Sequence, residues 1–190
     1  MDSPIPNRET SWNNSLETIL KKEAEQSEGL YWLHNRSQTI IQRKNDWLML
    51  PSIVISTING FLIGADTGTP TLVLGGISIL VSTLSSITQY YKYAQRAEGH
   101  RIAALMYLKL YKGIEIELAK PVAQRADPDD LLKALKDQMT RVAETAPQPV
   151  EAAIREYQSK FKEDRVSHPL VANGLSEVHI HSEARASIEV

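Results

Sequence analysis

Hydrophobic residues are concentrated in one central block of the chain, and polar residues dominate both ends. Between Trp47 and Tyr91 the only charged residue is Asp66. Two apolar stretches, residues 48–65 and 71–87, make up the block. Each is close to the ~20 residues that a helix needs to cross the hydrocarbon core of a bilayer. The pattern therefore predicts two transmembrane helices.

A short turn-forming segment joins the two stretches. It consists of Asp66-Thr67-Gly68-Thr69-Pro70, and Gly and Pro in such a cluster end one helix and precede another. Because so short a connection allows only a tight antiparallel return, we expect a helical hairpin. The alternative is a pair of core helices in a soluble bundle. We favour the hairpin because the helices of soluble proteins normally keep a polar stripe.

Aromatic and basic residues flank the apolar block. Trp47 precedes the first stretch and Tyr90 and Tyr91 follow the second, where amphipathic rings favour the headgroup layer of a membrane. The same flanks carry the basic residues Arg36, Arg43, Lys44, Lys92, Arg96 and Arg101, whereas the connecting segment carries none. Basic flanks usually stay in the cytosol. We therefore expect an integral, multi-pass membrane protein with both termini on the cytosolic side.

Small residues recur along both apolar stretches at intervals of three or four. They are Ser52, Ser56, Gly60 and Gly64 in the first stretch, and Gly75, Ser78, Ser82 and Ser85 or Ser86 in the second. Such stripes let two helix backbones approach closely, which favours packing within the hairpin. Alternatively, Asn59, Thr57 and the serines line a water path in an oligomer. The lack of ionisable residues in either stretch weakens this second interpretation.

Apolar residues at helical spacing continue on both sides of the block. Upstream, we expect one long helix that Ser11 caps and that is either continuous or broken near Gly29. Downstream, the second span should continue as a helix up to Pro121. Asp127-Pro128 is typical of a capped helix start, and a last amphipathic helix should follow Pro149.

These elements predict an all-α fold class, with a transmembrane hairpin, a small juxtamembrane helical bundle and an extended C-terminal tail. We divide the chain into a polar segment with an amphipathic helix at 1–46, the hairpin at 47–91, a juxtamembrane helical region at 92–164 and a tail at 165–190. The tail should be extended or disordered on its own, because it lacks helical periodicity.

Candidate chemistry is sparse. The chain has no cysteine and a net charge of −2, so we expect no thiolate metal site and no nucleic-acid partner. The best polar cluster is Glu98, His100 and Arg101, just past the second span. His100 could form a hydrogen-bonded contact that ties the hairpin to the upstream helix, which we favour, or could titrate as a pH switch. We expect no enzyme, cofactor or metal site, and we interpret His179 and His181 as part of a solvated tail.

Several segments resemble the two-transmembrane SLATT-like family, and most closely its members from large double-stranded DNA viruses of eukaryotes. The resemblance extends over about residues 30–161. Its most specific pieces are Leu33-His34, Pro51-Ser52-Ile53, the five residues from Ala97 to Arg101, and the helix start at Pro147 to Pro149.

The resemblance implies two different functions. Bacterial members are oligomeric membrane effectors that permeabilise the cell, whereas viral members look like structural proteins of the internal virion membrane. We favour the second function because no sensor domain is attached and the spans lack ionisable residues. The expected partners are therefore the lipid bilayer and capsid or other membrane proteins, which bind through both termini. Residues 166–190 would form one contact, and the chain could also form a homo-oligomer.

Overall fold

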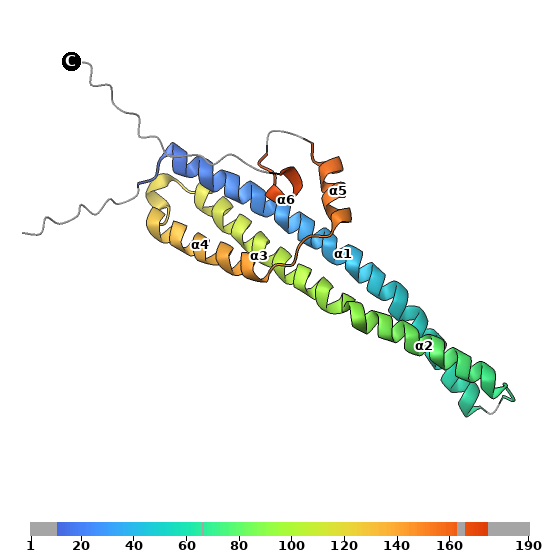
Figure 1. The fold of residues 1–190 in the computed structure, drawn as a ribbon. Helices are drawn as coiled ribbons and strands as arrows, with labels where there is room; N and C mark the ends of the chain where they lie inside the picture. The colour runs from blue at the N-terminus through green and yellow to red at the C-terminus, as the bar shows by residue number, and fades with distance from the viewer. Residues whose placement is uncertain (1–10, 66, 163–165, 175–190) are drawn as a thin grey trace, which may run out of the picture.

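The computed structural model describes residues 11–65, 67–162 and 166–174, and within these ranges every regular element is a helix. The helices are α1 (Asn14–Gly64), α2 (Thr71–Tyr91), α3 (Tyr93–Ala119), the 3-10 turn η1 (Val122–Gln124), α4 (Pro128–Thr145), α5 (Glu151–Lys160) and α6 (Leu170–Asn173). Figure 1 shows an elongated arrangement with a helical hairpin at one end and a bundle at the other. The expected all-α fold class is confirmed.

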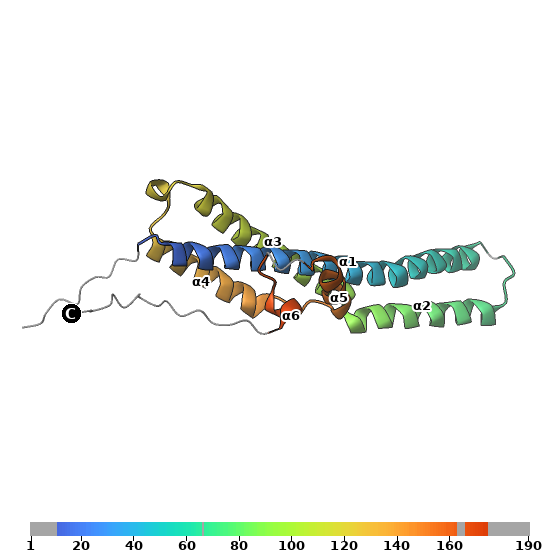
Figure 2. The same ribbon diagram turned by 90° about the horizontal axis from the view of Figure 1, so that it is seen from above.

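Helix α1 is one continuous element of 51 residues that belongs to both parts of the molecule. Its N-cap is Asn13, whose side-chain oxygen accepts a hydrogen bond from the Leu16 N–H at 2.8 Å, so the expected cap at Ser11 is wrong by two positions. No break occurs at Gly29, which is helical and buried. Pro51 also lies within the helix. Figure 2 shows α2 beside the second half of α1 and α4 beside the first half.

Helices α2 and α3 are separated by one residue, Lys92, whereas the sequence predicted a single helix. Lys92 has φ 47° and ψ 42°, a left-handed backbone conformation that residues other than Gly and Asn rarely adopt. Its backbone N–H donates to the carbonyl oxygens of Thr88 and Gln89. The break lies where the apolar stretch ends, and it redirects the chain into the bundle.

Two apolar clusters hold the bundle together. The first joins α1, α3 and α4 through Leu16, Leu20, Ala24, Leu110, Ile114, Leu135 and Val142. The second joins α1, α5 and α6 through Leu33, Ala153, Tyr157 and Ala172. Each fully buried leucine contributes about 2 kcal/mol. The first cluster fixes α3 and α4 against the first half of α1, and the second fixes α5 and α6 against it.

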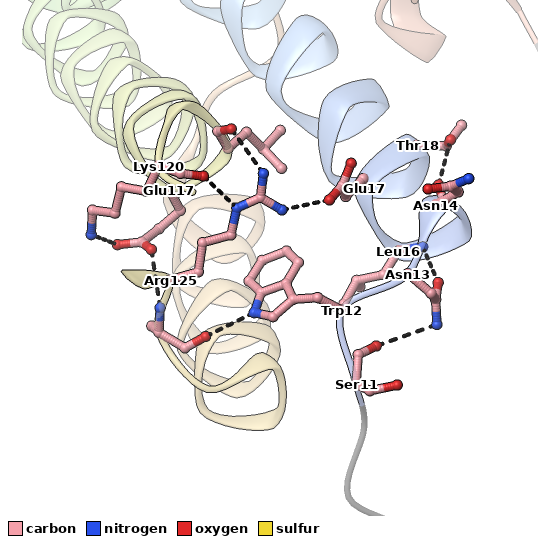
Figure 3. Close-up of polar contacts among 12 residues, drawn as sticks. Ser11, Trp12, Asn13, Asn14, Leu16, Glu17, Thr18, Glu117, Lys120 and Arg125 are labelled. Atoms are coloured by element: carbon pink, nitrogen blue, oxygen red, sulfur yellow. Dashed lines mark hydrogen bonds and ion pairs between the residues drawn. The ribbon is translucent and has the colours of Figure 1, made fainter. Parts of the chain in front are cut away.

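A polar cluster closes the end of the bundle opposite the hairpin (Figure 3). The Arg125 guanidinium donates to the Glu17 carboxylate at 2.6 Å and to the carbonyl oxygens of Lys120 and Leu118. The Trp12 indole N–H donates to the Ala126 carbonyl oxygen at 3.1 Å. The start of α1 is thereby tied to the segment between α3 and α4.

The first part of the predicted tail is folded rather than extended. Residues 166–174 lie against α1 and α5, with α6 as a single helical turn. Pro169 is fully buried, and it contacts Gly29 so closely that a Cβ on that glycine would lie 2.6 Å from the proline ring. The absence of a side chain at Gly29 therefore makes room for this segment. Residues 175–190, with His179 and His181, lie outside the described residues.

Candidate functional site

The contact between α1 and α2 contains a short polar seam, which we define as Ser52, Asn59, Ser78 and Ser85. The Asn59 side-chain N–H donates to the Ser78 hydroxyl oxygen at 3.0 Å, and the hydroxyl oxygens of Ser52 and Ser85 are 3.5 Å apart. Ser52 and Asn59 are both buried. The Asn59 Oδ1 atom accepts no hydrogen bond from the described residues. The seam joins two apolar helices by hydrogen bonds, which is how polar residues commonly stabilise helix pairs in membranes.

Only some of the small residues that we expected between the two helices lie at the contact. Ser52 is buried at the contact, and Ser78, although exposed, accepts the hydrogen bond from Asn59. Ser56, Gly60, Gly64, Gly75 and Ser82 are exposed and take no part in the seam. A Cβ added to any of these three glycines would meet nothing within 4 Å. A four-residue interval turns by about 40° per step around a helix, so the stripe leaves the contact face. In the C-terminal part of α1, the buried polar residues instead follow a seven-residue interval, Asn45, Ser52 and Asn59, which the sequence contained and our prediction missed.

The outer surface of the hairpin is apolar and exposed. In the most hydrophobic 18-residue stretch of α1, only 11% of the stretch is buried. In the corresponding stretch of the segment that α2 and α3 form, 0% is buried. Leu72, Ile79 and Phe61 expose 88%, 70% and 69% of their surface. Core helices of a soluble bundle would be mostly buried. Both segments are long and apolar enough to cross a membrane, and this exposure distinguishes them from the alternative of core helices.

Aromatic and basic residues surround the bundle end of the hairpin. Trp47 and Tyr90 expose 82% and 81% of their surface, and the rings of Tyr91 and Tyr93 stack with centroids 5.3 Å apart. The basic residues at this level are Arg43, Lys44, Lys92 and Arg96, all exposed. None of the four forms an ion pair with the described part of the chain. We call these aromatic and basic residues the collar.

His100 faces the bundle interior and meets a second histidine. The Nδ1 atoms of His34 on α1 and His100 on α3 are 3.1 Å apart, so one ring donates and the other accepts. Tyr107 stacks on His34 with ring centroids 5.4 Å apart. Burial and the nearby His100 lower the pKa of His34 from 6.5 to about 4. Burial and Arg96 lower the pKa of His100 as well. Both rings are therefore neutral near pH 7 and link the two long helices.

Glu98 and Arg101 point away from this pair. The Arg101 guanidinium donates two hydrogen bonds to the Glu98 carboxylate, at 2.8 and 2.7 Å, on the exposed side of α3. Positions 98 and 101 lie on other faces of the helix than position 100, so the two side chains bind each other. The partner that the sequence analysis missed is His34, 66 residues away, and a contact over such a distance has no local signal.

A cavity of about 430 Å³ lies beside the second apolar cluster. Trp32, Tyr157 and Phe161 line it, with the carboxylates of Glu25 and Glu28 at its edge. The Lys160 ammonium lies 5.7 Å from the Trp32 ring centroid, so a cation of the chain itself already contacts these aromatic faces. Within the described ranges, no group of three or more His, Asp or Glu side chains is placed to hold a metal ion.

Comparisons of the chain with protein-family models, curated proteins and solved structures gave no match. The resemblance to SLATT-like proteins therefore stays a prediction. Function has to be inferred from the hairpin, the collar and the bundle themselves.

Proposed function

We propose that this chain is a two-pass integral membrane protein with a structural role, in which the hairpin anchors the helical bundle to one side of a bilayer. The observation that carries the proposal is the contrast between the two ends of α1. Its first half buries Leu16, Leu20 and Leu33 against the bundle, whereas its second half exposes a continuous apolar surface. Exposed apolar surface of this extent requires lipid or another protein to cover it.

The geometry of the hairpin supports an anchor rather than a catalyst. The seam residues hydrogen-bond between α1 and α2, and the Thr57, Thr83 and Ser86 hydroxyls donate to carbonyl oxygens of their own helix. The basic residues lie in the collar at one end. This charge distribution favours a topology with the bundle and both termini on the cytosolic side. In the version that the resemblance implies, the membrane is the internal membrane of a virion and the bundle holds a minor or major capsid protein.

The first test separates an anchor from a soluble protein. The purified full chain is reconstituted into phosphatidylcholine vesicles that contain a trapped dye, and the vesicles are then washed with alkaline carbonate. We expect the protein to remain with the membrane and the dye to be retained. Release of the protein by carbonate would contradict membrane insertion.

A second experiment addresses the capsid-binding version. Deletion of residues 175–190 leaves Pro169 and α6 in place, so the bundle should remain folded. We expect this truncation to reduce co-purification with capsid proteins. A separate deletion of residues 1–10 tests whether the contact is shared by both termini. Undiminished association after both deletions would contradict capsid binding through the termini.

The exposed small residues favour a second candidate function, an oligomeric membrane effector. Ser56, Gly60 and Gly64 are not used within the hairpin, and such stripes let helices of neighbouring copies approach closely. In this case the reconstituted protein should release the dye. Gly60→Leu should then abolish release without altering the hairpin, because nothing lies within 4 Å of a Cβ at this position. Dye retention by the wild type at every protein concentration would rule out this candidate.

A further inference from the structure

A hollow of about 390 Å³ lies at the break between α2 and α3. Tyr91, Lys92, Gln95 and Arg96 line it on one side. On the other side it is closed by the end of α4 and the residues that follow, through Thr145 and Pro147. Pro147 packs over Gly99, where a Cβ would lie 3.7 Å from its ring. Two parts of the bundle far apart in the sequence therefore form the walls.

The hollow carries an uncompensated positive charge. Neither Lys92 nor Arg96 forms an ion pair with any described residue. The nearest acidic residue along α3, Glu98, is bound to Arg101 on the exposed side of the helix. None of the residues that line the hollow is acidic. An anionic ligand would therefore gain charge-assisted hydrogen bonds from both bases without displacing an existing partner.

The position of the hollow along the molecule indicates where such an anion would come from. Lys92 directly follows α2, and Tyr90 and Tyr91, which line the hollow, belong to the aromatic collar. In the proposed membrane orientation this is the depth of the phosphate groups of the cytosolic leaflet. Basic pockets at this level are typical binding sites for anionic lipid headgroups.

We propose that this hollow binds the headgroup of an anionic phospholipid, a role that rests on the proposed membrane insertion. The lipid phosphate would lie between the Lys92 ammonium and the Arg96 guanidinium. The Gln95 amide, which also lines the hollow, can donate to the rest of the headgroup, whereas the Thr145 hydroxyl already donates to the Arg141 carbonyl oxygen at 2.8 Å. The volume is within the range of small-molecule sites. A bound lipid would thereby connect the hairpin to the end of α4.

The test measures lipids retained by the full-length protein. The protein is purified in detergent, mixed with equal amounts of phosphatidylglycerol and phosphatidylcholine, and analysed by native mass spectrometry. The test variant is Lys92→Asn with Arg96→Gln, because Asn tolerates the left-handed conformation at position 92. The matched control is Arg43→Gln with Lys44→Gln, which removes the same charge from the collar on α1 outside the hollow.

We expect the wild type and the control to retain phosphatidylglycerol over phosphatidylcholine by about tenfold or more, and the test variant to lose most of this preference. Arg96→Gln alone should lose part of it, which covers the case in which the double variant fails to fold. If both double variants lost the preference for phosphatidylglycerol equally, or if the wild type showed no such preference, the proposed site would be wrong.

Competition with inorganic phosphate distinguishes a lipid from a free anion. Phosphatidylglycerol should stay bound at phosphate concentrations far above its own. Displacement at matched concentrations would show a site for free phosphate and overturn the lipid assignment. Carbonate extraction is measured in parallel on every variant, so a failure of membrane insertion is recognised separately from a failure of lipid binding.

Discussion

Arg125 illustrates how a single side chain fixes one end of the bundle. Its guanidinium reaches the Glu17 carboxylate and two carbonyl oxygens, and it lies 4.8 Å from the Trp12 ring centroid. The side chain is only 8% exposed. A planar group with five N–H donors can make these contacts at the same time, whereas an ammonium group cannot.

We therefore predict that Arg125→Lys is destabilising although it keeps the charge. The loss should be about 2 kcal/mol, because carbonyl oxygens and a carboxylate lose their donors. The measurement is the unfolding temperature in detergent, followed by circular dichroism. The control is Arg155→Lys, which alters an exposed pair with Glu151 and should change stability by less than about 0.5 kcal/mol. Equal effects of the two substitutions would contradict this account.

The histidine pair gives the bundle a pH dependence of defined sign. The pKa of His34 is about 4 in the folded chain, below its ordinary value of 6.5. The unfolded chain therefore takes up the proton first as the pH falls, and stability is lost between pH 6.5 and 4. We predict a loss of about 2 kcal/mol from His34 between pH 7.5 and 5.

The measurement is the unfolding temperature at the two pH values. His34→Phe keeps a ring that can stack on Tyr107 and should reduce the pH dependence, although it leaves His100 without its imidazole partner and lowers stability at pH 7.5. The control is His168→Gln, which removes a histidine in contact with Tyr157 and leaves the His34–His100 pair unchanged. If His34→Phe left the change in unfolding temperature between the two pH values unaltered, the pH dependence would have to come from other groups.

At the scale of elements, the contact between α1 and the 166–174 segment depends on one missing side chain. A Cβ on Gly29 would lie 2.6 Å from the Pro169 ring and 2.8 Å from the Tyr157 hydroxyl oxygen. A proline ring cannot rotate away, so the segment itself would have to move.

We predict that Gly29→Ala lowers stability by about 1–3 kcal/mol, the usual cost of overpacking, despite the better helix propensity of alanine. It should also increase proteolysis after Lys160 or Lys162. Gly113→Ala is the matched control, because a Cβ there meets nothing within 4 Å. It should stabilise α3 by about 0.5–1 kcal/mol. A stabilising effect of both substitutions would show that the 166–174 segment is not held against α1.

Most helices could be predicted from the sequence because their signals are local. Asp127 accepts hydrogen bonds from the N–H groups of Asp129 and Asp130, as its position before Pro128 predicted. The break at Lys92 has no such signal, since neither Gly nor Pro marks it. Only part of the contact face of the hairpin was predicted, Ser52 and Ser78, because small residues suggested a four-residue stripe. The pairing of His100 with His34 depends on how two distant helices align, and local patterns do not specify that.

At the scale of the whole molecule, the proposed topology places the connecting segment and the bundle on opposite sides of the membrane. The chain contains no cysteine, so single cysteines report on each side without background. We predict that Thr67→Cys and Gln124→Cys react with a membrane-impermeant maleimide from opposite sides of sealed vesicles. Both residues are exposed. Labelling of both from the same side would contradict a two-pass hairpin.

The unbroken course of α1 has a mechanical consequence. About 50 Å of helix separates Asn14 from Trp47, with neither a loop nor a left-handed residue along it. In the proposed orientation, this segment is rigidly continuous with the shorter part of α1 after Trp47, which is embedded in lipid. A change in bilayer thickness that alters the tilt of the hairpin would swing the Trp12 end sideways by a larger distance. The same helix would hold any partner bound at the Trp12 end at a fixed distance from the membrane. The length of α1 would therefore set the spacing between the membrane and that partner.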